Sequence, residues 1–448
     1  MILTAKWVLP ISAEPISPGA VVINDEEIEA VGFKEEVLAN YPKEEVRDLG
    51  EAILLPGLIN LHTHLDYTIL RGENDNLPFL PWISNLVQKS RALEYDEVLL
   101  SAKLGALELL AAGVTTIADT TATGASLQAA SEMKLRGIIY QEVFGMDDEQ
   151  LEANLLNIKK RYNELKAKAS NRLEVGLSPH APYSVSRRLL QEVADVSQSE
   201  DIPLCMHVAE TEEEIDFLID GTGPFATTYR EAVGWSNIHW DPPGIPAVRY
   251  LNDLGILNDR FLAVHLVQTD PEEIEILNEL DVKAAYCPKS NAKLGAGIAD
   301  LSAMLDAGVL VGLGTDSAAS NNSLDLFSEM EFGLLLQRAK DREASIVTAK
   351  ELVKMTTING AKALGLEDKV GSLEPGKQAD LTAVKISNFA NQPVYNPYSA
   401  LAYTASSRDI AFTMIGGEVL YDQGEFLDVA KEEMIFEFKN LQQKIMGL

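Results

Sequence analysis

The chain has 448 residues, a formal net charge of −31 at pH 7 and 46% hydrophobic residues, a composition typical of a globular protein. An acidic body repels phosphate backbones and anionic lipid surfaces, so we expect neither nucleic acid nor a membrane as a partner. The first residues lack a basic leader and a cleavage site, and no uncharged run approaches ~18 residues. With only Cys205 and Cys287, the chain suits a reducing compartment, and we expect a cytoplasmic location.

Eight strand candidates recur along the chain with helical stretches between them. They are continuously apolar before their polar ends, as a parallel sheet buried on both faces requires, and they cover residues 52–65, 113–120, 136–144, 173–182, 202–211, 261–269, 282–291 and 309–317. Intervening segments such as 96–113 and 345–365 place apolar residues at helical spacing and end in glycine. Eight β-then-α units predict an α/β fold, a (β/α)8 TIM barrel with its active site at the carboxyl ends of the strands.

The two ends of the chain carry a different pattern. Short strand candidates lie at 20–32, 380–386 and 412–426, so residues 1–53 and 369–448 are predicted to form one small β-sandwich domain beside a barrel of residues 54–368. The amphipathic stretch 430–446 predicts a terminal helix that packs on the body of the protein.

Five of the six histidines stand at the ends of strand candidates, which is the strongest chemical signal in the chain. His62 and His64 are two residues apart, so on a strand both imidazoles point to the same face and reach one ion. His207 and Asp316 complete a set of three imidazoles and one carboxylate. This set suits one divalent metal, zinc or iron, with a position left for water, and it indicates a catalytic centre.

Two irregular loops, 71–91 and 219–246, follow the first and fifth strand candidates. Long loops on the catalytic face shape the substrate pocket, so the predicted lining residues are the aromatic ones, Phe79, Trp82, Phe225 and Trp235. No other candidate metal-ligating or catalytic residue accompanies His239 in its loop, so it is interpreted as structural. Cys205 shares the strand face of His207, yet we interpret it as a small apolar packing residue.

The motifs PGLINLHTHL, LRG, SPHAPYS, HVAET, CPKSNAKLGAG, GLGTDSAASNN and GSLEPGKQADLTAV resemble the deaminase branch of the amidohydrolase superfamily over nearly the whole chain. That branch contains deaminases of S-adenosylhomocysteine, methylthioadenosine, guanine and aminodeoxyfutalosine. The resemblance implies that the metal ligands are His62, His64, His207 and Asp316, and that Glu210 is the proton shuttle, His265 a group beside the bound water, and His180 and Ser320 substrate contacts. Two-metal relatives bridge their ions with a lysine in the fourth strand, and LEVGLSPHAPYSV has none, so one metal is expected.

The chemistry of hydrolytic deamination needs residues of these types. A divalent metal lowers the pKa of bound water to about 7 and so supplies hydroxide at neutral pH. A ring nitrogen must be protonated and the amine must leave as ammonia, so one carboxyl group has to accept and return protons. Glu210 stands three residues after His207 for this role, Asp316 accepts the proton of water, and His265 holds the developing oxyanion.

The substrate prediction depends on one departure from the family pattern. Adenosine-type relatives carry a ribose-binding glutamate in the first loop, and counting from Trp82 places Arg91 there instead. A guanidinium at that position favours a substrate with a carboxylate, such as aminodeoxyfutalosine.

Several alternatives stay open at this point. They are an adenosine-type deaminase, a guanine-type deaminase, a triazine-type chlorohydrolase and a non-catalytic binding protein. The last is disfavoured because no ligand has been lost from the chain. Only a small-molecule substrate is expected as a partner, and assembly as a homo-oligomer is compatible with the sequence.

Overall fold

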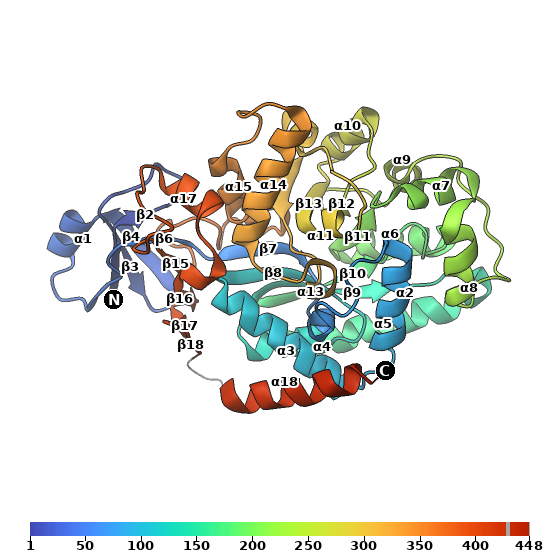
Figure 1. Ribbon diagram of the computed structural model, residues 1–448, viewed down its shortest axis with the longest axis horizontal. Helices are drawn as coiled ribbons and strands as arrows, with labels where there is room; N and C mark the ends of the chain where they lie inside the picture. The colour runs from blue at the N-terminus through green and yellow to red at the C-terminus, as the bar shows by residue number, and fades with distance from the viewer. Residues whose placement is uncertain (427–430, 448) are drawn as a thin grey trace.

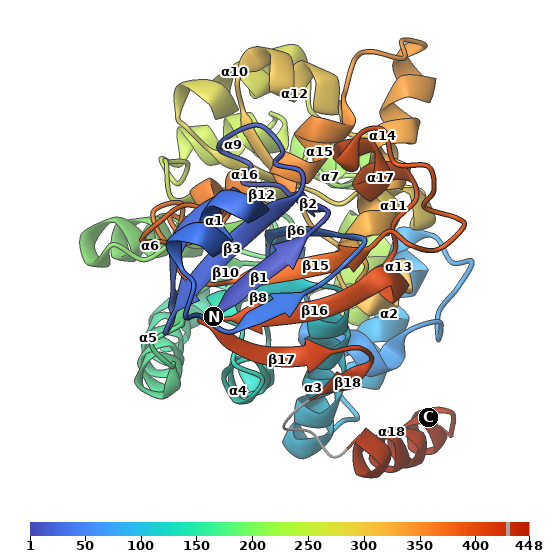
Figure 2. The ribbon, with the colours of Figure 1, turned by 90° about the vertical axis from the view of Figure 1, so that its left-hand side faces the viewer.

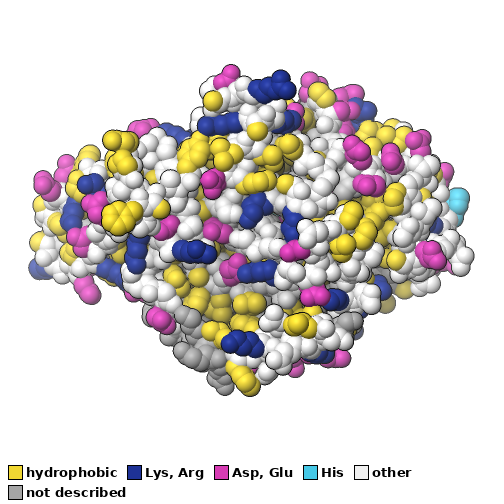
Figure 3. All heavy atoms as spheres, viewed as in Figure 1, with side chains coloured by type: hydrophobic (Ala, Val, Ile, Leu, Met, Phe, Trp, Pro, Cys, Tyr) yellow, Lys and Arg dark blue, Asp and Glu magenta, His cyan; other side chains and the backbone are white. Residues whose placement is uncertain are grey.

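The computed structural model describes residues 1–426 and 431–447. A barrel forms most of the molecule, and two smaller sheets lie against one side of it (Figure 1). Figure 3 shows acidic and basic side chains interspersed over one face of the molecule. Within the described residues, no helix combines the length and apolarity needed to span a bilayer.

The eight predicted strands form one parallel sheet in sequential order, which confirms the barrel. Its members are β7 (Leu58–Thr63), β8 (Val114–Thr121), β9 (Arg136–Val143), β10 (Leu173–Pro179), β11 (Leu204–Val208), β12 (Phe261–His265), β13 (Lys283–Tyr286) and β14 (Leu310–Leu313). Helices alternate with them along the chain, including α3 (Tyr95–Ala111), α4 (Ala125–Glu132), α5 (Leu151–Lys168), α6 (Arg187–Glu200), α7 (Glu212–Asp220), α9 (Ala247–Asp253), α10 (Pro271–Glu279), α11 (Pro288–Lys293), α12 (Leu301–Ala307) and α14 (Leu326–Asp341). The strands are buried on both faces, which explains their continuous apolar sequences.

Side chains and loop backbone close the barrel between β14 and β7. The Asn60 side chain donates to Thr315 Oγ1 at 2.8 Å and accepts from the Thr315 amide at 3.0 Å. The amides of Thr315 and Asp316 both donate to the carbonyl of His62. This closure brings the last strand against the His-x-His strand and fixes Asp316 beside the histidines.

The chain termini build two facing sheets, as the predicted sandwich requires (Figure 2). One contains β1 (Ile2–Ala5), β3 (Gly19–Asn24), β4 (Glu27–Phe33) and β5 (Val46–Asp48), and the other contains β2 (Trp7–Val8), β6 (Ala52–Pro56), β15 (Leu381–Lys385), β16 (Ile410–Ile415), β17 (Glu418–Asp422) and β18 (Glu425–Phe426). Apolar side chains from both sheets share one core, with Leu3 and Val21 facing Leu381 and Phe412. The predicted boundaries at 53/54 and 368/369 stay predictions.

Two predicted elements are each divided in the structure. Residues 52–65 form β6 in the terminal sheet and β7 in the barrel, with Gly57 between them, where a Cβ would lie 2.2 Å from the Thr115 side chain. The predicted helix 345–365 is split into α15 (Ala349–Met355) and α16 (Ile358–Ala363). The chain unwinds there because the carbonyl of Thr356 accepts a hydrogen bond from Ile59 at the start of the barrel.

Three further helices lie outside the barrel repeat: α1 (Lys34–Asn40), α17 (Pro397–Tyr403) and α18 (Lys431–Ile445). The last of them confirms the predicted terminal helix, although Ala430 lies outside the described residues. It runs beside α3, where Lys444 pairs with Glu97 at 2.6 Å (Figure 1).

Candidate metal centre and active site

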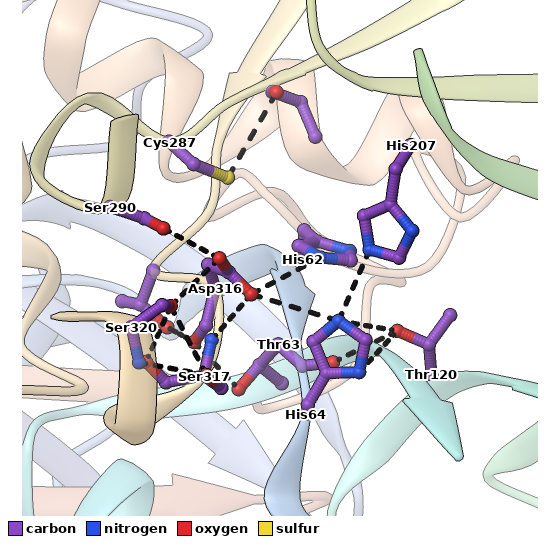
Figure 4. A network of polar contacts seen from close by, with 12 residues as sticks. His62, Thr63, His64, Thr120, His207, Cys287, Ser290, Asp316, Ser317 and Ser320 are labelled. Carbon is purple, nitrogen blue, oxygen red and sulfur yellow. Dashed lines mark hydrogen bonds and ion pairs between the residues drawn. The ribbon is translucent and has the colours of Figure 1, made fainter. Parts of the chain in front are cut away.

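The predicted metal ligands converge at the carboxyl ends of the barrel strands (Figure 4). His62 lies on β7 and His64 directly after it, and their ring centroids are 4.8 Å apart. His207, on β11, places its ring centroid 5.1 Å from that of His62 and its Nε2 3.2 Å from Nε2 of His64. Asp316 follows β14, and its Oδ1 is 3.6 Å from Nε2 of both His62 and His64.

These donors fit one divalent ion. Two sets of three residues bring all their ligand atoms within 4.8 Å of one another, and both sets contain His62: one adds His64 and Asp316, the other His207 and His265. Both ring nitrogens of His62 are buried and have no hydrogen-bond partner among the described residues. A buried imidazole without a partner is costly unless it ligates a metal, so the donor set itself supports an ion here.

Four of these histidines, His64, His180, His207 and His265, favour the neutral form, which is the form that ligates a metal. Burial, and then the neighbouring histidines, lowers the pKa of His64 to about 3 and holds that of His207 well below its usual range. Burial also lowers the pKa of His265 to about 4 and that of His180 to about 3. For Asp316, burial favours the neutral form, but the surrounding histidines outweigh it and hold its pKa well below the usual range.

Hydrogen bonds behind the ligands orient them. The Nδ1 of His207 lies 2.7 Å from the carbonyl oxygen of His180, which must accept, so Nε2 is left free for the metal. Ser290 and Ser320 donate to Oδ2 of Asp316 at 2.6 and 2.8 Å and leave Oδ1 toward the histidines. Ser320, predicted as a substrate contact, is thus placed behind Asp316 and outside the residues that line the cavity.

Glu210 lies at the start of the loop after β11 and is 4% exposed. Its Oε1 is 3.6 Å from Nε2 of His265, whose Nδ1 lies 2.8 Å from Oδ1 of Asn291. Burial, with the charge of Asp316, raises the pKa of Glu210 well above its usual value. Burial therefore favours the protonated carboxyl more than in an exposed glutamate, in a position to give its proton to a bound molecule.

A narrow cavity of about 80 Å³ opens from this centre. Its walls come from the barrel ends, from α2 (Phe79–Ser90) and from the short helix Phe225–Tyr229, and they consist of His64, Tyr67, Phe79, Trp82, Ile83, Leu86, Val87, Glu142, Phe144, His180, Tyr183, His207, Glu210, Tyr229, His265, Asp316 and Ser317. Small-molecule pockets usually measure at least about 300 Å³, so the cavity in this conformation is smaller than a typical small-molecule site.

The residues singled out in the sequence differ in how they lie relative to the cavity. His180, Trp82 and Phe79 line the cavity, whereas Phe225 and Trp235 pack behind its wall against Phe79 and Tyr229 respectively. His239 is exposed, and Cys205 packs inside the barrel. Arg91 is exposed at the end of α2 and does not line the cavity, although its charge acts on Tyr229 at the wall.

Sequence reasoning missed Glu142, Tyr67, Phe144, Tyr183 and Tyr229, all of which line the cavity. Glu142 was detectable, because it stands at the polar end of the third strand candidate, where barrel enzymes place functional residues. Burial, and then the charge of Asp66, raises the pKa of Glu142 to about 8.

A larger hollow of about 700 Å³ lies between α3 and α18, but it is not the candidate site. It contains none of the five converging histidines, and its walls carry pairs such as Lys444 with Glu97. The active site is identified by the residues that converge on the smaller cavity, and not by the volume of a cavity.

The model of the amidohydrolase family matches residues 53–420. The chain belongs to this family. It is 33% identical over 432 residues to a 5-methylthioadenosine/S-adenosylhomocysteine deaminase of Moorella thermoacetica, covering 95% of each chain. It is 34% identical over 430 residues to a 5'-deoxyadenosine deaminase of Methanothermobacter thermautotrophicus, covering 95% of this chain and 94% of the other.

Among solved structures, the amidohydrolase resembles an adenosine deaminase of Xanthomonas campestris with bound zinc, at a TM-score of 0.88 and 26% identity over 100% of this chain and 98% of the other. The family match and the deaminase relatives identify this amidohydrolase as a metal-dependent hydrolase that acts on C–N bonds. The predicted class of enzyme is therefore confirmed.

Proposed function

We propose that this amidohydrolase removes the exocyclic amine of an adenine nucleoside as ammonia. The observation that carries the proposal is the pairing of a four-residue metal site with a buried Glu210, whose pKa is raised by burial, inside an aromatic cavity. The names of the relatives, deaminases of adenosine and of its 5'-substituted derivatives, support the same chemistry.

One divalent ion, proposed as zinc with iron as the alternative, would be held by His62, His64, His207 and Asp316. Such an ion supplies an activated water and polarises the group that it contacts. The neutral imidazoles of His64 and His207 and the ionised Asp316 are already in the protonation states that this role needs.

Glu210 is proposed to move the protons of the reaction. Its carboxyl donates a proton to a ring nitrogen of the purine and then carries one to the departing amine. His265 gives its Nδ1 proton to Oδ1 of Asn291, so its Nε2, at 3.6 Å from the same carboxyl, is placed to accept a hydrogen bond from the attacking water. His180 and Trp82 are proposed to hold the heterocycle, since both line the cavity.

The 5'-substituent of the nucleoside is proposed to extend from the cavity towards the end of α2. Arg91 stands there beside Tyr229, and its guanidinium would attract a carboxylate on that substituent. This supports aminodeoxyfutalosine as the substrate, as the sequence favoured. Methylthioadenosine and S-adenosylhomocysteine are the second candidates, since relatives with 33% identity carry those names.

Ammonia release tests the proposal directly. The zinc-loaded enzyme is given adenosine, 5'-deoxyadenosine, methylthioadenosine, S-adenosylhomocysteine, aminodeoxyfutalosine, guanine and a chlorinated triazine. We expect ammonia from adenine nucleosides, with aminodeoxyfutalosine giving the highest kcat/KM. Release of chloride from the triazine alone, or of ammonia from guanine alone, contradicts the proposal.

A further inference from the structure

Glu142 is a carboxylate of the cavity wall that the proposed chemistry does not use. It is the last but one residue of β9, it is 5% exposed, and it lines the cavity together with Tyr67 and Phe144. Its Oε1 is 3.9 Å from Nδ1 of His64, beyond hydrogen-bond distance.

The second oxygen of Glu142 lacks any partner. Its Oε2 is buried and accepts no hydrogen bond from the described residues. The neighbouring carboxylate of Asp66 differs in this respect, because it accepts from the hydroxyls of Thr121 and Thr123 and from the amide of Ser126. A buried acceptor without a hydrogen-bond partner is unfavourable, so Glu142 is placed to accept from a donor that arrives with a ligand.

The position of Glu142 relative to His64 indicates which part of a ligand it meets. His64 turns Nε2 towards His207 and Asp316, at 3.2 and 3.6 Å, and its Nδ1 towards Glu142. The width of an imidazole therefore separates Glu142 from the side of His64 that faces the other ligands. A group bound by Glu142 lies away from the reacting carbon.

The chemistry of the substrate then limits which of its groups can donate a hydrogen bond to Glu142. Three carboxylates line the cavity, and two of them, Glu210 and Asp316, serve the reacting end. A neutral adenine nucleoside carries hydrogen-bond donors only on its exocyclic amine, which leaves in the reaction, and on its sugar hydroxyls. The donor that remains for Glu142 is a hydroxyl.

We propose that Glu142 is a specificity-determining residue that accepts a hydrogen bond from a sugar hydroxyl of the nucleoside. This inference rests on the proposed function. It assigns the carboxyl end of β9 to recognition of the sugar, and it makes nucleosides that lack that hydroxyl poor substrates.

The test measures kcat/KM of the zinc-loaded full chain with methylthioadenosine and with its 2'-deoxy and 3'-deoxy analogues. We expect the wild type to lose at least ~10-fold on one of the two analogues, because removal of the hydroxyl leaves the buried oxygen of Glu142 without a hydrogen-bond partner. Glu142→Leu should lower kcat/KM for the parent nucleoside by a similar factor and should turn over that analogue as fast as the parent. The kcat/KM of Glu142→Gln for the parent nucleoside should lie between those of the wild type and Glu142→Leu, since its amide oxygen still accepts a hydrogen bond. This variant alone provides the test if Glu142→Leu does not fold.

The matched control is Asp66→Asn, which changes a neighbouring buried carboxylate outside the cavity and should leave the wild-type ratio between parent and analogue intact. Metal content is measured for every variant, because loss of zinc from Glu142→Gln would assign Glu142 to orienting His64 and overturn the proposal. An equal effect of the substitutions on all three nucleosides overturns it as well, while the deaminase function stands. If the wild type releases no ammonia from any nucleoside tested, the proposed function fails and this inference fails with it.

Discussion

The carboxylate of Glu214 accepts a hydrogen bond from the backbone amide of Glu210 at 2.8 Å, and a second from that of Ala209 at 3.0 Å. Glu214 lies in the first turn of α7 and is fully buried. Ala209 has a φ of 53°, a left-handed conformation that is unfavourable for alanine. Glu214 therefore stabilises the strained turn that aims Glu210 at the metal centre.

Glu214→Ala is expected to lower kcat by at least ~10-fold, because two buried amides lose their acceptor and the turn that positions Glu210 relaxes. Zinc content and KM should change little, and Glu214→Gln, which keeps one acceptor oxygen, should restore most of the rate. Steady-state kinetics and elemental analysis provide the measurements, and the exposed neighbour Glu212→Ala is the control. A parallel loss of zinc would assign Glu214 to holding the ligands instead.

One equivalent of metal per chain is expected, and His207→Ala should reduce it to below roughly a tenth while abolishing ammonia release, since loss of one imidazole leaves an incomplete coordination shell and weakens metal binding. Metal content of purified protein, with and without added zinc, measures this. His239→Ala removes an exposed imidazole and should change neither quantity. Two equivalents per chain, both required for turnover, would refute the single-ion site.

The barrel and the convergence of the ligands were predictable because both depend on local patterns. Continuous apolar runs identify strands buried on both faces, and a His-x-His pair on a strand must share a face. Glu142 and Glu214 follow no motif. Their roles depend on which groups the fold leaves without partners. Only the three-dimensional arrangement shows that Oε2 of Glu142 has no hydrogen-bond partner among the described residues and that Glu214 accepts from the amide of Glu210.

The place of Arg91 shows a different limit of the sequence. Counting from Trp82 along the loop predicts a residue in the pocket, yet the segment folds as α2, and Arg91 is exposed at its end. The orientation of α2 is set by packing of Phe79 against Phe225, residues that lie far apart in the chain. Contacts of this kind are invisible to a count across one loop.

Glu210→Gln is expected to keep zinc and the fold but to lose at least ~10²-fold in kcat, the scale of general acid–base catalysis. The amide has nearly the same shape as the carboxyl group, but it cannot donate a proton and take it back. Single-turnover ammonia release at saturating nucleoside isolates the chemical step. A variant that retains more than about a tenth of the wild-type rate would show that another group carries the proton.

The pH dependence of stability should reveal the buried Glu329, which accepts from Asn321 at 2.6 Å and whose pKa is raised by burial to about 7. A raised pKa means that the folded state binds the proton more tightly, so this stabilisation is complete below about pH 4 and is lost as the pH rises through about 7. Glu329→Gln removes the titration. The free energy of unfolding of the variant, measured by chemical denaturation, should therefore increase relative to that of the wild type between pH 5 and pH 8, by up to about 3 kcal/mol. A difference that stays constant with pH would mean that Glu329 is ionised throughout.

The last prediction concerns Arg91, whose guanidinium lies at the end of α2 and acts on Tyr229 in the cavity wall. If the 5'-substituent extends along α2, its carboxylate meets this cation, and Arg91→Met should lower kcat/KM for aminodeoxyfutalosine by at least ~10-fold. Methylthioadenosine carries no carboxylate and should change by less than about twofold. Lys89→Met is the matched control, because it removes a cation of α2 that pairs with Glu73 in the preceding loop, and it should spare both substrates. Because Arg91 is exposed, its attraction is screened by salt, so the preference for aminodeoxyfutalosine should weaken between low and high ionic strength. Equal losses on both nucleosides, or a preference that does not respond to salt, would remove the carboxylate from the specificity of this enzyme and leave methylthioadenosine and S-adenosylhomocysteine as its candidates.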